Sequence, residues 1–206
     1  MNSESDDRAS AERVRTIFAE GAALRAAFAA EMAGRIAEAA RRITRCFEAG
    51  GKLLLFGNGG SAADAQHIAA EFVNRFVAER RALPALALTT DTSALTSIAN
   101  DRHYDEVFAR QLEAWGRPGD IALAISTSGR SPSVLRAVAT CRALGVSTIG
   151  LTGGGGGPLA TEVDLSIDVS GSRNTARIQE IHITVGHVIC ELVDSALASV
   201  PAHSTR

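Results

Sequence analysis

Five short apolar runs separated by helical stretches constrain the fold of this 206-residue chain more than any other feature. Each run is bounded by Gly, Pro, Asp or Ser, and they cover residues 52–57, 84–89, 121–126, 147–151 and 164–169. Each is too short for an independent helix and is typical of a buried strand. Strands that alternate with helices imply right-handed crossovers. The pattern predicts an α/β fold in three layers, with a mainly parallel five-stranded sheet flanked by helices.

Helical segments are predicted at both ends of this core. Residues 8–49 carry apolar side chains at spacings of four or seven, namely Phe28, Met32, Ile36, Ile43 and Phe47. We interpret 8–49 as a helical hairpin whose apolar stripe packs on the body or on another subunit, and 173–199 as a closing helix. The polar ends, 1–7 and 200–206, are expected to be disordered. A single domain over 8–199 is therefore expected.

Composition argues against several classes of protein. The formal net charge is -2 and aromatic residues make up 4%, which speaks against a basic nucleic-acid binder or a stacking platform for single strands. No apolar stretch approaches the roughly 20 residues of a membrane span, and the acidic start is unlike a signal peptide. Cys46, Cys141 and Cys190 are far apart and are interpreted as buried free thiols. We expect a cytoplasmic protein that binds neither nucleic acid nor membrane.

A glycine-rich turn follows the first predicted strand. It contains Asn58, Gly59, Gly60 and Ser61, and Ser61 is the expected N-cap of the next helix. Exposed N–H groups and the helix dipole favour an anion at such a turn. The alternatives are a turn without a ligand and a dinucleotide site. The dinucleotide site fits poorly, because Ala62 stands where that motif has its third glycine.

A second loop of this kind follows the predicted strand at 121–126. It reads Ser126-Thr127-Ser128-Gly129-Arg130-Ser131-Pro132, with Ser131 as the expected N-cap and Pro132 at the first helical position. Its hydroxyl groups and helix N-terminus would make a neutral cradle for a phosphate. Because ligands bind at the carboxyl edge of a parallel sheet, the two turns together predict a phosphorylated sugar or polyol.

Two pairs of residues on predicted helices could carry the chemistry. His67 and Glu71 are spaced i and i+4, so they share one helix face, and on a mostly buried helix such a pair indicates a metal or an acid/base role. Gln179 and His187 lie about 80° apart around the closing helix and about 12 Å apart along it. They could meet one ion only from either side, or with help from a neighbouring subunit. We interpret His182 as a satisfied buried histidine.

Asn100 and Asp101 follow another apolar stretch. Such residues most often serve as caps, and the alternative is that they bind sugar hydroxyl groups.

Taken together, these segments resemble the sugar isomerase (SIS) domain family, and within it the isomerases of phosphorylated heptoses. The blocks that carry the resemblance are 57–67, 98–101, 126–131 and 177–182, together with His187. The resemblance implies a homotetramer with active sites between subunits. It also implies interconversion of sedoheptulose 7-phosphate and D-glycero-D-manno-heptose 7-phosphate, the first step toward activated heptose for lipopolysaccharide or other surface glycans.

The resemblance also implies roles for individual residues. The sugar phosphate would be contacted by Asn58, Gly59, Gly60, Ser61, Glu71, Asn100, Asp101, Ser126, Thr127, Ser128, Ser131 and Gln179. One zinc ion per subunit would be held by His67, Glu71, Gln179 and His187, and Glu71 and His187 would be the catalytic acid/base pair. Because Glu71 cannot be a tightly held ligand and a free base at once, zinc would be structural, transient or orienting.

Two other functions stay open. One is a non-catalytic member of the family that binds a partner such as the bacterial replication initiator. The other is a sensor that binds a sugar phosphate without turnover. Neither needs a buried acid/base couple, so Glu71 and His187 favour the enzyme.

Overall fold

The computed structural model describes residues 3–198, with side chains from residue 6, and it contains one five-stranded sheet. All strand pairs are parallel, in the order β2-β1-β3-β4-β5. The strands are β1 (Leu53–Gly57), β2 (Ala85–Ala87), β3 (Ile121–Ser126), β4 (Ser147–Gly153) and β5 (Leu165–Val169). This confirms the predicted parallel α/β sheet, with the second strand shorter than expected.

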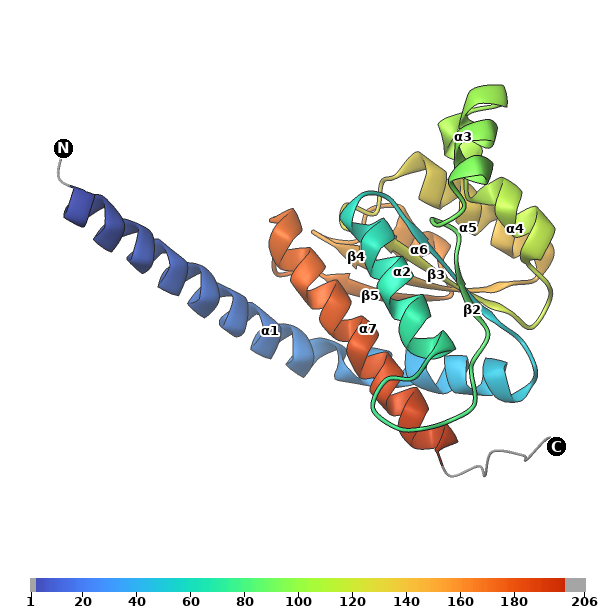
Figure 1. Cartoon of the computed structure of the whole chain (residues 1–206), viewed down its shortest axis with the longest axis horizontal. Helices are drawn as coiled ribbons and strands as arrows, with labels where there is room; N and C mark the ends of the chain where they lie inside the picture. Colours follow the sequence, from blue (N-terminus) through green and yellow to red (C-terminus); the bar gives the residue numbers. More distant parts are fainter. Residues whose placement is uncertain (1–2, 199–206) are drawn as a thin grey trace.

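Helices cover both faces of the sheet and complete three layers (Figure 1). On one side lie α1 (Ser3–Glu48), α2 (Gly60–Val73) and α7 (Thr175–Leu197). The other side holds α3 (Thr92–Asp101), the 3-10 helix η1 (Tyr104–Glu106), α4 (Ala109–Trp115), α5 (Pro132–Leu144) and α6 (Leu159–Glu162). The closing helix predicted over 173–199 corresponds to α7.

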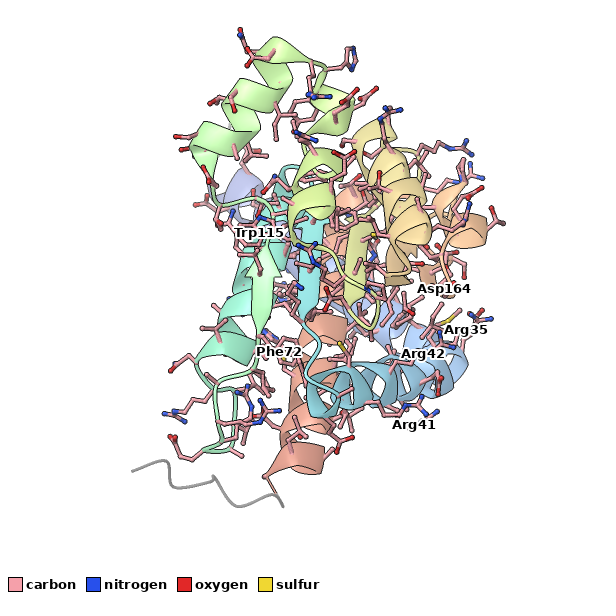
Figure 2. The ribbon with its side chains drawn as sticks, turned by 90° about the vertical axis from the view of Figure 1, so that its right-hand side faces the viewer. Arg35, Arg41, Arg42, Phe72, Trp115 and Asp164 are labelled. Carbon is pink, nitrogen blue, oxygen red and sulfur yellow. The ribbon has the colours of Figure 1, made fainter. Side chains whose placement is uncertain are left out.

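The strand side chains alternate between two hydrophobic cores. Leu53 and Leu55 of β1 pack with α1, α2 and α7, whereas Leu54 and Phe56 pack with α4 and α5. Successive residues of a strand point to opposite faces, so a strand covered on both faces must be apolar throughout. Phe72 of α2 lies 5.4 Å, between ring centroids, from Phe47 of α1, and it belongs to the first of these cores (Figure 2). The continuous apolar runs of the sequence are therefore explained by burial on two sides.

The N-terminal segment is one continuous helix, so the prediction of a helical hairpin over 8–49 is wrong. α1 runs for 46 residues and begins at Ser3, inside the segment that was expected to be disordered. Its sequence is rich in Ala, Arg and Glu, which favour a helix over a turn, and only single glycines interrupt it. The C-terminal part of α1 packs on α7 and β5, and its N-terminal part projects from the body (Figure 1). The predicted tail 200–206 lies outside the described residues.

The three cysteines are free and buried, as predicted. Burial raises the pKa of the Cys46 thiol to about 11, and the pKa of Cys141 and of Cys190 to about 12. Thiols with such pKa values stay protonated and are poor nucleophiles. Within residues 3–198, no helix combines the length and the apolar character that crossing a bilayer requires.

Candidate active site

α2 and α7 lie side by side on one face of the sheet and carry the central residues of the site (Figure 1). Gly186 of α7 permits this close packing, because a Cβ atom at that position would lie 2.5 Å from Cδ1 of Ile68. The next residue on α7 is His187, and the residue before Ile68 on α2 is His67. The contact between Gly186 and Ile68 therefore brings the two histidines together, with their ring planes 70° apart in a T-shaped arrangement.

His67, Glu71 and His187 form a compact cluster. The Nε2 atoms of His67 and His187 are 2.8 Å apart, and the His67 Nε2 atom is 3.4 Å from Glu71 Oε1. One ligand atom from each of the three residues lies within 4.8 Å of the others. The structure thus brings together three of the four predicted metal ligands, and both members of the predicted acid/base pair.

The chemistry of this donor set fits a metal ion. Two imidazole nitrogens and one carboxylate oxygen are ligands typical of a catalytic zinc site, which keeps a further position open. The His67 side chain is 49% exposed and that of Glu71 is 23% exposed, so the cluster is accessible from solvent. A small-molecule ligand could therefore reach the same side chains.

Asp64 lies near this cluster, although the sequence analysis did not select it. Burial raises the pKa of its carboxyl group, and the nearby imidazoles of His67 and His187 act in the opposite direction. One of its oxygens, Oδ2, is buried without a hydrogen-bond partner among the described residues. The only local signal was its position three residues before His67, one turn earlier on α2.

Phe76 is a second residue that the sequence analysis missed. Its ring stacks on the imidazole of His187, with centroids 5.4 Å apart and planes 19° from parallel. Phe76 lies in the segment that follows α2, and no periodicity marks that segment. The stacked ring restricts the orientations that the His187 imidazole can adopt.

Gln179 lies near the start of α2. A Cβ atom at Gly60 would overlap the Gln179 carboxamide nitrogen, so this carboxamide packs directly on the glycine-rich turn. The parallel packing of α2 and α7 accounts for this placement, since Gln179 lies opposite Gly60 and His187 lies opposite His67. The role of Gln179 as a fourth ligand stays a prediction.

Asn58 connects the two predicted anion-binding turns. Its Nδ2 atom donates hydrogen bonds to Ser131 Oγ (2.8 Å) and Ser133 Oγ (3.0 Å). Its Oδ1 atom accepts a hydrogen bond from the Tyr104 hydroxyl group (2.8 Å). Because β1 and β3 are parallel neighbours in the sheet, the two turns that follow them lie at the same edge. Ser133 and Tyr104 were not predicted, because neither belongs to a recognisable turn motif.

The helix that follows the first turn begins two residues earlier than predicted. α2 starts at Gly60 with Gly59 at the N-cap, and the prediction that Ser61 caps this helix is wrong. Gly59 has φ 56°, a conformation that glycine adopts without strain. Ser61 is buried in the first turn of the helix. The turn therefore presents backbone rather than a capping hydroxyl group.

The second turn follows the prediction more closely. Ser131 occupies the N-cap position of α5 and Pro132 follows it. The Ser131 hydroxyl group nevertheless makes no capping bond, because Asn58 and Ser133 engage it. Gly129 N donates to Ser126 O (3.0 Å) and closes the loop that carries Thr127 and Ser128.

Asn100 and Asp101 end α3 and are exposed. Asn100 Nδ2 donates to Asp101 Oδ1 (2.8 Å). Among the described residues, no hydrogen bond joins either side chain to Asn58 or Ser131. Their predicted contact with the substrate stays a prediction.

His182 is fully buried on α7 and lies apart from the cluster. Its Nε2 atom lies 2.9 Å from the Thr152 carbonyl oxygen, so it donates a hydrogen bond there. Burial lowers the pKa of this imidazole to about 4. The interpretation of His182 as a satisfied core histidine is confirmed for Nε2, whereas Nδ1 has no partner among the described residues.

Comparison with known proteins gives consistent matches. Residues 17–153 match the SIS domain. The phosphoheptose isomerase of Desulfovibrio desulfuricans is 59% identical over 175 residues, which cover 85% of this chain and 83% of that protein. The phosphoheptose isomerase of Roseiflexus sp. is 62% identical over 158 residues, covering 77% of this chain and 80% of that protein.

Solved structures agree with these sequence matches. The phosphoheptose isomerase of Neisseria gonorrhoeae superposes with a TM-score of 0.84 at 42% identity, covering 89% of this chain and 98% of that one. The phosphoheptose isomerase of Francisella tularensis has a TM-score of 0.87 at 37% identity, covering 90% of this chain and 98% of that one.

Proposed function

Because the chain belongs to the SIS domain family, and within it to the phosphoheptose isomerases, we propose that it interconverts D-sedoheptulose 7-phosphate and D-glycero-D-manno-heptose 7-phosphate. This reaction would be the first step toward nucleotide-activated heptose for lipopolysaccharide or other surface glycans. The observation that carries the proposal is the cluster of Glu71 with two histidines beside an anion-binding edge of the sheet.

Aldose–ketose isomerisation needs a base and an acid that act on neighbouring atoms of the substrate. A proton moves between C1 and C2 through an enediol, and another proton is exchanged at the carbonyl oxygen. In our proposal the Glu71 carboxylate moves the proton between the carbons, and the His187 imidazole donates to the oxygen. Their ligand atoms lie within 4.8 Å of each other, so both can reach one pair of bonded atoms.

The phosphate end of the substrate would bind at the two turns. Asn58, Gly59, Gly60 and Ser61 would supply one side of this site. Ser126, Thr127, Ser128 and Ser131 would supply the other side, and Asn100, Asp101 and Gln179 would hold sugar hydroxyl groups. His67 lies seven residues beyond Gly60 on α2, a rise of about 10 Å, which an extended seven-carbon sugar phosphate can span. The two parts of the site are thus separated along the helix by the length of the substrate.

One zinc ion per subunit would be held by His67, Glu71, His187 and Gln179. The nitrogen and oxygen donors of His67, Glu71 and His187 support three of these ligands, whereas Gln179 packs on Gly60 at the other end of the site. When bound, zinc would supply Lewis-acid stabilisation of the negative charge that develops on the substrate oxygen.

We further propose a homotetramer with active sites between subunits. Val14 and Phe18 are 53% and 75% exposed on the projecting part of α1, and their i, i+4 spacing places them on one face. A second copy of the chain would cover this face. A neighbouring subunit would also close the open side of the cluster, where the His67 side chain is 49% exposed.

A cytoplasmic location fits the three free cysteines, since such thiols persist where the environment is reducing.

The test is turnover of sedoheptulose 7-phosphate by the purified protein. We expect the aldoheptose phosphate to form, and Glu71→Gln and His187→Gln each to lower kcat by about 100-fold or more. Glu191→Gln and His103→Gln are matched controls at exposed positions and should keep full activity. Undiminished turnover in both Glu71→Gln and His187→Gln would refute the catalytic assignment. Binding of the sugar phosphate without turnover by the wild-type protein would point to the sensor instead.

A further inference from the structure

Arg80 and Asp194 form an ion pair in the interior of the protein. Each side chain is 2% exposed, and Arg80 Nε donates to Asp194 Oδ1. Arg80 lies in the segment 74–84 that follows α2, and Asp194 lies on α7. Two charges removed from water cost several kcal/mol each unless hydrogen bonds satisfy all of their polar atoms. The partners of these two side chains therefore indicate what the pair holds in place.

The Arg80 guanidinium group binds the C-terminal end of α2. It donates to the carbonyl oxygens of Glu71 (2.8 Å), Phe72 (2.9 Å) and Arg81 (3.1 Å). The last carbonyl groups of a helix have no partner within the helix, and a positive charge there interacts favourably with the helix dipole. Arg80 thus fixes the backbone of Glu71 itself.

The Asp194 carboxylate binds the segment beyond α2. Its Oδ2 atom accepts hydrogen bonds from the backbone N–H groups of Val77 (3.0 Å) and Ala78 (3.2 Å). These residues directly follow Phe76, whose ring stacks on His187. Asp194 lies seven residues after His187 on α7, two turns along, so both side chains point from the same face of that helix.

From these contacts we infer that Arg80 and Asp194 are positioning residues for the active site, an inference that rests on the proposed isomerase function. The pair ties the end of α2 that carries Glu71 to the helix that carries His187. It also fixes the backbone next to Phe76, so that the Phe76 ring stays against the His187 imidazole. Neither residue touches the substrate, and both act through Glu71 and His187.

Arg80→Lys tests this inference, because it keeps the charge and removes the geometry. One ammonium group cannot reproduce the planar fork that reaches Asp194 and three carbonyl oxygens together. We expect kcat to fall by about 10- to 100-fold, the range that a displacement near 1 Å produces. The KM should stay within about threefold, because the turns around Asn58 are untouched.

Lys52→Met is the matched control. Lys52 pairs with Asp120 (2.6 Å), whose side chain is 4% exposed, and this pair lies at the end of β1 opposite the site. The substitution also leaves a buried carboxylate unpaired, so it should destabilise the fold. Because it does not touch α2 or α7, kcat measured well below the melting temperature should equal the wild-type value.

A second measurement separates positioning from a general loss of stability. In the metal-free protein, the Phe76 ring shifts the NMR resonances of the His187 ring protons through its ring current. Arg80→Lys should move these resonances toward their unstacked values, and Lys52→Met should not. A folded Arg80→Lys protein with wild-type kcat, or with lowered kcat and unmoved His187 resonances, would overturn the inference.

Two further outcomes are also decisive. If Arg80→Lys does not fold, Asp194→Asn takes its place, because it keeps the size of the side chain but removes the charge that pairs with Arg80, and a folded Asp194→Asn protein with wild-type kcat would overturn the inference. If the wild-type protein does not isomerise the heptose phosphate, the proposed function fails. The His187 resonances of Arg80→Lys then decide the positioning role by themselves.

Discussion

The Nε2 atoms of His67 on α2 and His187 on α7 lie 2.8 Å apart, with the Glu71 carboxylate 3.4 Å from the first of them. At this distance two neutral imidazoles can share one hydrogen bond, whereas two protonated imidazoles would repel each other. A cation bound between the two rings would replace the shared proton, with one Nε2 lone pair from each imidazole directed at it.

We predict that His67→Ala lowers the free energy of zinc binding by more than it lowers the free energy of unfolding. Changes outside the ligand set already cost about 10- to 100-fold in metal affinity, so loss of one ligand should cost at least as much. Competition with a chromophoric chelator measures the affinity. His103→Gln, an exposed histidine of the same chain, should bind zinc like the wild type. Equal zinc affinity in His67→Ala would remove His67 from the ligand set.

Gly60→Ala should impair the reaction without harming the fold. A Cβ atom there would overlap only the flexible end of Gln179, so the side chain must move while the helix stays intact. Alanine also favours the helix by up to about 1 kcal/mol. We therefore expect unchanged or raised stability in urea, together with a lower kcat/KM. Gly34→Ala is the control, because a Cβ atom at Gly34 meets nothing within 4 Å.

Asn58→Asp should raise the KM for the sugar phosphate by more than about tenfold, a loss of at least 1.4 kcal/mol. The carboxylate cannot donate to Ser131 and Ser133 as the Asn58 amide does, and its charge would repel a phosphate. Tyr104→Phe removes a single hydrogen bond to Asn58 and should cost less, about 1 kcal/mol. Steady-state kinetics, with inorganic phosphate as a competitor, measure both variants. An unchanged KM in Asn58→Asp would place the phosphate elsewhere.

Stability should fall between pH 6.5 and pH 4 because of His182. Burial lowers the pKa of this histidine in the folded protein from 6.5 to about 4, so in this range the unfolded chain binds a proton that the folded protein does not. The associated loss in the free energy of unfolding is complete near pH 4 and amounts to about 3 kcal/mol. Urea unfolding at several pH values measures it. His182→Gln should flatten this part of the profile, and an unaltered slope in that variant would contradict the assignment.

Phe18→Glu should dissociate the proposed tetramer. Phe18 is 75% exposed on the projecting part of α1, and a charge there would oppose burial against a second copy. Light scattering coupled to size exclusion measures the mass at micromolar concentration. Trp115→Glu, at an exposed aromatic residue of α4 on the other side of the sheet, should keep the wild-type mass. A tetramer that persists in Phe18→Glu would exclude this face of α1 from the interface.

Local patterns predicted most of the fold but not the course of α1. The strand runs and the Ser131-Pro132 start of α5 follow from burial on two faces and from capping chemistry, and both depend on residues close in sequence. The hairpin over 8–49 was wrong because no turn residues were present to form it, and the isolated glycines of α1 do not suffice to end a helix. α2 starts earlier than predicted because Gly59, which has a positive φ, takes the N-cap position that was assigned to Ser61.

The sequence by itself determined the order of strands and helices along the chain, the two turns at the carboxyl edge of the sheet, and the shared face of His67 and Glu71. Each of these follows from spacings of a few residues, which helix and strand geometry fix. Only the tertiary structure decided that His187 meets His67, that Phe76 covers it, and that Arg80 and Asp194 tie the two helices together. These contacts depend on how closely α2 and α7 approach at Gly186, and close packing between distant segments leaves no periodic trace in the chain.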